Sequence, residues 1–205
     1  MRRIVVLALA GAVVMAAGPA RADFFNGKDL AGLEGLKEYW SVKDGAIVGD
    51  SGPKGLKFNT FLCSKKTYGD FEMSFRVKLE GGRGNSGVQI RSKIINMKTF
   101  AVGGPQADIG AGYWGSLYGE AFGGMMKAAP KDSQKAIKPT DFNDYSIRCV
   151  GKKVTIRING TTFIDEEFAK MPPTGIIAFQ LHAGGPIVVT FDKISFRELK
   201  DGKKD

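Results

Sequence analysis

The chain has 205 residues, and its 30 Lys and Arg against 21 Asp and Glu give a formal net charge of +9 at pH 7. Much of the basic excess lies in loop and tail segments, and no basic stripe interleaved with aromatic residues is visible, which argues against a nucleic-acid partner. The length is sufficient for one domain with a substantial core.

The N-terminal segment predicts export. Met1-Arg2-Arg3, an apolar run over residues 4–17 and an Ala20-x-Ala22 site are typical of a Sec signal peptide over residues 1–22. A membrane anchor is the alternative, but about 14 apolar residues are short for a span and no second apolar segment follows. We therefore expect a periplasmic or extracellular protein with no stable membrane insertion after cleavage. Cleavage removes three arginines and lowers the formal charge from +9 to +6.

The first strands are expected after a turn at residues 24–30 and a loop that runs to residue 38. Asp44-Gly45 between two short apolar runs predicts a hairpin. Residues 71–79 are apolar at odd positions and polar at even ones, which predicts an antiparallel strand with one face on a core. The same alternation over residues 154–158 leads into Asn159-Gly160, which predicts a second hairpin with a type I′ turn.

The C-terminal third predicts a strand over residues 175–182, a turn at Gly184-Gly185-Pro186 and a strand over residues 187–199. In the last strand the apolar residues move from odd to even positions, so we expect a bulge near Asp192. Residues 125–141, rich in Lys and Pro, predict a surface loop that borders a site.

No long helical periodicity occurs in residues 23–199, and turn signals recur about every ten residues. These patterns predict a single all-β domain of two packed antiparallel sheets over residues 23–199 with few or no long helices, followed by a charged C-terminal tail over residues 200–205. Cys63 and Cys149 are the two cysteines. They could pair in an oxidising compartment, but both fall in strand-like apolar runs where a free thiol also packs well.

Three strands repeat one polar pattern. Side chains alternate across a strand, so two polar residues separated by one apolar residue share a face. The pairs are Gln89 with Arg91, Gln106 with Asp108, and Gln180 with His182. Together they could tile the open face of one sheet as the floor of a pocket. Each also has a structural alternative: Arg91 as an exposed charge or as the partner of Asp108, His182 as a strand-end histidine, and Asp108 as a turn residue. A buried arginine left unpaired is costly, so we expect an acidic neighbour of Arg91 in either case.

Residues 106–120 combine an amide, two carboxylates and aromatic rings between glycines. Amides and carboxylates bond sugar hydroxyls, and an aromatic face accepts the C–H side of a sugar ring. The relevant side chains are Gln106, Asp108, Tyr113, Trp114, Tyr118 and Glu120. The alternative is a glycine-rich loop whose aromatics close the core. We expect Gln106 and Asp108 in a strand and residues 113–120 in a loop above it.

Motifs spread over nearly all of residues 23–199 resemble the 3-keto-disaccharide hydrolase family. They are Phe25-Asn26-Gly27-Lys28-Asp29-Leu30, Trp40-x-Val42-x-Asp44-Gly45, Asn85-Ser86-Gly87-Val88-Gln89-Ile90-Arg91, residues 106–120, Asn143-Asp144-Tyr145 and Gln180-Leu181-His182-x-Gly184-Gly185-Pro186. The resemblance implies a concanavalin-A-like β-sandwich (jelly roll), an extracytoplasmic location and action on glycosides oxidised at C3. One departure is Asp141-Phe142-Asn143, where such proteins often carry Glu-Trp-Asn, so Asp141 is not assigned to the site.

The implied chemistry starts from the C3 ketone, which acidifies the proton at C2. A base removes that proton, the glycosidic oxygen leaves C1, and water then adds back; direct hydrolysis is the alternative. His182 is the first choice of base because imidazole exchanges protons near neutral pH, with Asp108 or Glu120 as substitutes. Arg91 would bind the carbonyl or enolate oxygen and Tyr118 would donate to the leaving group.

The substrate would be held by residues of the same pattern, namely Gln106, Asn85, Gln89, Gln180, Trp114 and Tyr113. A divalent cation bound by Asp108, Glu120 or His182 could replace Arg91 as the electrophile. Two other functional classes stay open: a non-catalytic, lectin-like carbohydrate-binding module, and a basic periplasmic interaction protein with no small-molecule site. Neither the glycoside nor the oligomeric state is specified by the sequence.

Overall fold

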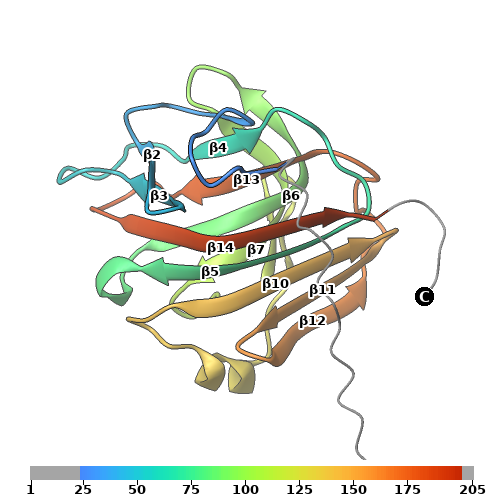
Figure 1. Cartoon of the computed structure of the whole chain (residues 1–205). Helices are drawn as coiled ribbons and strands as arrows, with labels where there is room; N and C mark the ends of the chain where they lie inside the picture. The colour runs from blue at the N-terminus through green and yellow to red at the C-terminus, as the bar shows by residue number, and fades with distance from the viewer. Residues whose placement is uncertain (1–23, 200–205) are drawn as a thin grey trace, which may run out of the picture.

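The computed structural model describes residues 24–199, so the expected signal peptide and charged tail lie outside the described residues. Two antiparallel seven-stranded sheets pack face to face (Figure 1). Helical structure within residues 24–199 is confined to the 3-10 turns η1 (Glu80–Gly82) and η2 (Lys131–Ala136), and no helix there is long and apolar enough to cross a membrane. The predicted all-β, two-sheet sandwich is confirmed.

The two sheets differ in strand order. Sheet A runs β1-β4-β13-β6-β7-β8-β9 and sheet B runs β12-β11-β10-β5-β14-β3-β2. The strands of sheet A are β1 (Leu33–Glu34), β4 (Thr60–Ser64), β6 (Asn85–Asn96), β7 (Ala101–Gly110), β8 (Leu117–Glu120), β9 (Gly124–Lys127) and β13 (Ile176–Leu181). Those of sheet B are β2 (Trp40–Lys43), β3 (Ala46–Asp50), β5 (Phe71–Leu79), β10 (Asn143–Val150), β11 (Lys153–Ile158), β12 (Thr161–Glu167) and β14 (Val188–Glu198).

The main core lies between the sheets and follows the predicted alternation. Every odd residue of β5 is buried, and Ile177, Phe179 and Leu181 of β13 face it from sheet A. The rings of Phe179 and Phe191 are 4.6 Å apart. Burying one such side chain stabilises the fold by about 1.5–3 kcal/mol. This apolar layer therefore determines which face of each strand points into the core and which points outward.

Both predicted hairpins are confirmed. Asp44 and Gly45 have φ of 50° and 77° between the paired residues Lys43 and Ala46. Asn159 and Gly160 have φ of 50° and 81° in the turn from β11 to β12. Positive φ at both central residues is what a type I′ turn requires.

The bulge predicted near Asp192 is also present. The pairing of β14 with β5 shifts between Asp192 and Ser195, and Lys193 has φ of 48°. Phe191 and Phe196 are consequently both buried although they have opposite parity.

Three segments expected as loops contain short strands. β1 forms within the expected N-terminal loop, β8 covers the second half of the expected loop at residues 113–120, and β9 begins the expected loop at residues 125–141. These strands have two to four residues, too few to display an alternating pattern. β8 and β9 matter for function because they extend sheet A beside β7.

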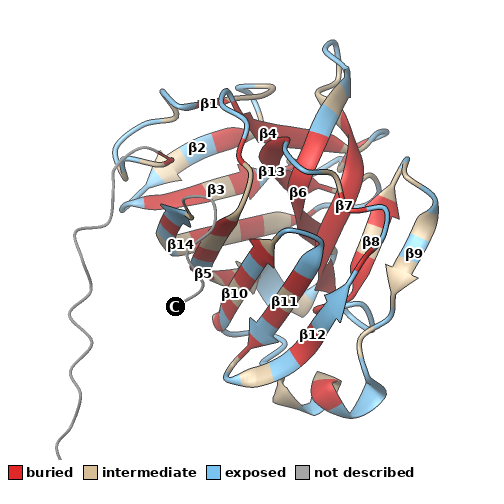
Figure 2. Cartoon of the chain, turned by 90° about the vertical axis from the view of Figure 1, so that its right-hand side faces the viewer, coloured by how far each residue is buried: buried red, intermediate tan, exposed pale blue. Residues whose placement is uncertain are grey.

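Nearly every residue of β7 and β13 is buried, so sheet A is covered on its outer face as well along these central strands (Figure 2). A second apolar cluster of Phe61, Cys63, Val102, Ile176 and Ala178 lies there, with Ile94 and Phe100 of the β6–β7 hairpin packed against it. The Thr60 hydroxyl donates to the Thr99 carbonyl at 2.7 Å and ties the hairpin tip to β4. Phe61 pairs with Gln180 and Ala178 pairs with Gln89, so this apolar cluster adjoins the predicted polar residues; we call this side the sheltered face of sheet A.

The two cysteines are free and buried. Cys149 lies in the core between the sheets, whereas Cys63 lies in the cluster on the outer face of sheet A. Burial raises the pKa of the Cys63 thiol to about 12 and that of Cys149 to about 11. The question left open by the sequence is thus answered: the two thiols are unpaired and poorly reactive.

Candidate functional site

Three glutamines meet on the sheltered face of sheet A, one from each of the neighbouring strands β6, β7 and β13. Gln89 Nε2 donates to Gln106 Oε1 at 3.0 Å, and Gln106 Nε2 lies 2.9 Å from Asp108 Oδ1 and 3.3 Å from Gln180 Oε1. All four side chains are buried. The alternation therefore placed these residues correctly; we call Gln89, Gln106, Gln180 and Asp108 the polar floor.

A glycine makes this connection geometrically feasible. Gly87 of β6 pairs with Asp108 of β7, and a Cβ on Gly87 would lie 2.5 Å from Gln106 Cδ. Because position 87 has no side chain, Gln106 crosses over β6 and reaches Gln180 on the far strand.

Arg91 does not belong to the floor, which corrects the sequence prediction. Between the pairs Ala178–Gln89 and Ile176–Ser92 the register shifts, and Arg91 has φ of 46°. This bulge breaks the alternation, turns the arginine inward and puts Ser92 beside Gln89, where its hydroxyl lies 2.6 Å from Gln89 Oε1.

The Arg91 guanidinium is completely enclosed and fully bonded. It contacts Asp70 Oδ1 at 2.6 Å and the carbonyl oxygens of Gly69, Gly151 and Pro172 at 2.8, 2.6 and 3.1 Å. The acidic neighbour that a buried arginine needs is present, but it is Asp70 rather than Asp108. Arg91 fastens three loops to sheet A and is not available to a substrate.

Trp114 is the second correction. It is 4% exposed and packs in the core between the sheets, so its ring offers no face to a ligand. For this residue the structural alternative, an aromatic that closes the core, is correct. Tyr113, at the tip of the turn between β7 and β8, is 51% exposed, which leaves it free in solvent at the end of the sheet.

Tyr118 and Glu120 reach the sheltered face by way of β8. Tyr118 pairs with Gln106, and Glu120 pairs with Gly104. Since residues paired across antiparallel strands share a face, both half-buried side chains border the floor.

Asn59 completes the rim and had no signal in the sequence. Its Nδ2 donates to Glu120 Oε1 at 3.0 Å, and its Oδ1 accepts from the backbone N–H of Ala183 at 2.8 Å. It thereby joins β8 to the end of β13. The partners are 61 and 124 residues away, a separation over which no spacing rule operates.

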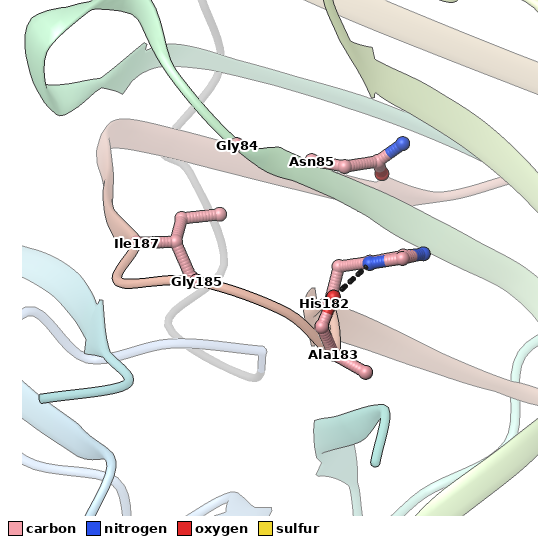
Figure 3. A pocket seen from close by; sticks show the side chains of 6 residues that line it. All are labelled: Gly84, Asn85, His182, Ala183, Gly185 and Ile187. Carbon is pink, nitrogen blue, oxygen red and sulfur yellow. Dashed lines mark hydrogen bonds between the residues drawn. The ribbon is translucent and has the colours of Figure 1, made fainter. Parts of the chain in front are cut away.

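His182 and Asn85 line a pocket of about 160 Å³ at the end of the floor, together with Gly84, Ala183, Gly185 and Ile187 (Figure 3). The His182 Nδ1 atom lies 2.6 Å from the Ala183 carbonyl oxygen. A carbonyl only accepts, so Nδ1 carries the hydrogen and Nε2 keeps a lone pair in the neutral ring. Figure 3 shows Nε2 and the Asn85 amide extending to the same side. Ligand pockets usually measure about 300–1,000 Å³, so this one is small.

Asp108 has an unusual proton affinity. Burial raises the pKa of its carboxyl from 3.8 to about 7, the bond from Gln106 opposes this, and the negative charge of Glu120 adds to it. Near neutral pH the group therefore divides between acid and carboxylate, and it can either give or take a proton.

Two buried polar atoms of this site have no partner within residues 24–199: Asn85 Oδ1 and Gln180 Nε2. An unsatisfied buried group costs about 1–3 kcal/mol, so it is normally explained by a ligand or another unrecorded partner. One of these atoms accepts and the other donates, a combination that suits the hydroxyl and carbonyl groups of a sugar.

A metal centre finds less support. Among residues 24–199, no group of three or more His, Cys, Asp and Glu side chains is placed to hold a metal ion. Asp108, Glu120 and His182 border one face but do not converge as a ligand set, so we derive no step through a cation.

Comparison with known proteins identifies a family for the chain. A family model described as a 3-keto-alpha-glucoside-1,2-lyase-like domain matches residues 21–200. No curated protein sequence matches the chain.

Among solved structures, a candidate glycosyl hydrolase from Parabacteroides distasonis is 19% identical, with a TM-score of 0.63 over 86% of this chain and 92% of that one. The carbohydrate-binding module CBM66 from Bacillus subtilis is 14% identical, with a TM-score of 0.59 over 82% of this chain and 96% of that one. A Bacillus subtilis protein with a galectin-like fold is 11% identical, with a TM-score of 0.58 over 81% and 88% of the two chains. At these identities the likeness shows a shared sandwich fold.

Proposed function

The chain belongs to the 3-keto-alpha-glucoside-1,2-lyase-like domain family, and from this premise we propose that it is an exported enzyme that cleaves glycosides oxidised at C3. The observation that carries the proposal is the presence of two proton-transfer groups at one polar floor, one within it and one in the pocket at its end. His182 presents a free Nε2 lone pair, and Asp108 is a carboxyl whose pKa is raised to about 7.

The reaction begins at C2 of the sugar. His182 Nε2 takes the C2 proton, and the electron pair moves into the C3 carbonyl as an enolate. As the enolate collapses, the bond between C1 and the glycosidic oxygen breaks, and protonated Asp108 gives its proton to the departing oxygen. The products are the free aglycone alcohol and a sugar with a C1=C2 double bond conjugated to the ketone.

Water completes the cycle with the same two groups. Asp108, now a carboxylate, takes a proton from water as the hydroxyl adds to C1, and the His182 imidazolium, whose N–H exchanges with solvent in the meantime, gives a proton to C2. Both groups end in their starting states, and the net change is hydrolysis of the glycosidic bond.

Amides replace the arginine as electrophile. Gln180 Nε2 is a buried donor of the floor, suited to the enolate oxygen that forms again at C3 when the hydroxyl adds to C1, and Asn85 Oδ1 is an acceptor suited to a sugar hydroxyl. Tyr118 borders Gln106 from β8 and would line the leaving-group side.

Turnover of a 3-keto-glycoside in D₂O tests the proposal, with the same glycoside unoxidised at C3 as the matched control. The expected result is a released sugar that carries deuterium at C2, and no cleavage of the control. Release without deuterium would indicate direct hydrolysis instead. Binding without turnover would sink the enzyme proposal in favour of a carbohydrate-binding module, and an absence of both would leave the interaction-protein class.

A further inference from the structure

The amides of the polar floor form a chain that can run in two directions. A carboxamide carries a donor nitrogen and an acceptor oxygen in nearly the same shape, so turning it by 180° exchanges their places. In one direction Gln89 donates to Gln106 at 3.0 Å and Gln106 donates to Asp108 at 2.9 Å. This forward direction needs Asp108 as a carboxylate, because its Oδ1 must accept.

The forward direction leaves two defects. Gln180 Nε2 has no partner. When the Gln89 amide is turned, its nitrogen lies 2.6 Å from Ser92 Oγ and 3.2 Å from both the Gly104 and Pro105 carbonyl oxygens. In the forward direction the Gln89 oxygen lies there instead, and it faces the Gly104 and Pro105 carbonyl oxygens, which can only accept.

Turning Gln89 forces its neighbours to turn as well. The Gln89 oxygen then meets Gln106 Oε1 at 3.0 Å, so Gln106 must present its nitrogen there instead. The Gln106 oxygen consequently takes the place 2.9 Å from Asp108 Oδ1 and 3.3 Å from Gln180 Oε1. Two oxygens at hydrogen-bond distance require a proton between them, which Asp108 supplies as a carboxylic acid. The Gln180 amide then also turns and donates to the Gln106 oxygen, so Gln180 Nε2 gains a partner.

The surroundings of Asp108 favour the protonated, reversed chain. Glu120 on β8 adds negative charge, and burial penalises the carboxylate. From sheet B, the neutral Tyr145 hydroxyl donates to the Asp108 backbone carbonyl at 3.2 Å and not to its carboxyl. His182 at the end of β13 and Tyr118 on β8 are the other titratable side chains near the floor.

We infer that Gln89, Gln106 and Gln180 form a proton-linked relay that reverses direction when Asp108 gains or loses its proton. The three glutamines are positioning residues. While Asp108 is the acid, Gln180 is occupied by Gln106; when Asp108 gives its proton away, Gln106 turns to stabilise the carboxylate and the Gln180 N–H is released toward the ligand. The use made of that proton rests on the proposed function, whereas the coupling itself does not.

Side-chain amide NMR tests the relay without any substrate. The chain has four glutamines, Gln89, Gln106, Gln134 and Gln180, so labelling of their amide nitrogens gives a small set of signals. Gln134, which donates to the Trp114 carbonyl, is the internal control. Over a titration through neutral pH, the three floor glutamines should shift with one common midpoint that matches the Asp108 carboxyl carbon, and Gln134 should stay fixed.

Gln89 and Gln180 decide the outcome, since Gln89 bonds to Gln106 and Ser92 rather than to Asp108. Their common midpoint should vanish in Asp108→Asn. In Gln106→Met, Gln89 should no longer follow Asp108 although Asp108 still titrates. The relay would be overturned if the Gln89 and Gln180 signals stayed fixed while wild-type Asp108 titrates. It would also be overturned if Gln89 kept the midpoint of Asp108 in either variant. Coupling without turnover would instead reject only the proposed function.

Discussion

Arg91 and Asp108 are both buried ionisable residues of sheet A, but the number of polar partners around them differs sharply. Arg91 is surrounded by acceptors, including Asp70 and three loop carbonyls, and its whole donor set is bonded. Asp108 receives one side-chain bond, from Gln106, and faces Glu120 across the floor. A saturated charge stabilises structure, whereas a poorly compensated carboxyl retains its proton and is available for chemistry.

The largest expected effect lies on the chemical side of this comparison. His182→Ala removes the base next to the floor, and a general base contributes about a hundred- to ten-thousand-fold to turnover. kcat on a 3-keto-glycoside should fall by that range while the thermal midpoint is unchanged. Added imidazole should restore part of the rate through the vacated pocket. Full activity in the variant would remove His182 from the mechanism.

Arg91→Met tests the structural side. It leaves the Asp70 carboxylate without its cation, so the free energy of unfolding measured in urea should fall by about 3–5 kcal/mol. Arg91→Lys is the matched control and should fall between wild type and the Met variant, because an ammonium keeps the charge but loses the forked donors. Turnover per folded molecule should not change. A loss of kcat with an unchanged free energy of unfolding would show that Arg91 acts on the substrate after all.

The pH dependence of stability sharpens the contrast. The folded protein holds the Asp108 proton more tightly than the unfolded chain, since burial raises the pKa from 3.8 to about 7. The contribution of Asp108 to the free energy of unfolding is therefore largest below about pH 4 and is lost as pH rises to about 7. The change is on the order of a few kcal/mol. The measurement is the free energy of unfolding in urea at several pH values. Subtracting the value for Asp108→Asn from that for wild type isolates the pH dependence due to Asp108. A flat difference for Asp108 would contradict the assignment.

Gly87→Ala should have a moderate effect. The added methyl would lie 2.5 Å from Gln106 Cδ, so Gln106 must leave its place over β6. Overpacking of this kind costs about 1–3 kcal/mol of unfolding free energy. The misplaced floor should lower kcat on the order of ten- to a hundredfold. Gly69→Ala is the control, because its nearest contacts would be 3.8 Å away.

Tyr113→Ala should have the smallest effect. The side chain is 51% exposed on a turn, and substitutions at such positions usually change stability by less than about 0.5 kcal/mol. Neither the melting temperature nor kcat should move measurably. A clear loss of substrate affinity would show that the ligand extends past the end of β7.

Periodicity was sufficient for the main sheets and for four floor residues. A strict two-residue repeat placed Val88, Ala107 and Phe179 in the core and their glutamine neighbours opposite them. It failed at Arg91 because one extra residue in a strand reverses every later side chain, and nothing in Gln89-Ile90-Arg91-Ser92 announces the insertion.

One rim residue, Asn59, and the buried position of Trp114 could not be predicted by any local rule. Asn59 acts through partners brought near by the sheet order, and Trp114 was drawn into the core by the surface it could bury. Residue type indicated that the stretch from Gln106 to Glu120 was important, but it could not separate an aromatic that packs from one that binds.

Gly87 offers a criterion for sorting other sequences that share this sandwich. Any residue with a Cβ at the equivalent position would close the path by which an amide on β7 crosses to β13. A chain with glutamines on the three strands but a larger residue there cannot assemble this relay. Reading that single position would therefore separate relatives able to couple a buried acid to a remote amide from those in which the three strands carry unconnected amides.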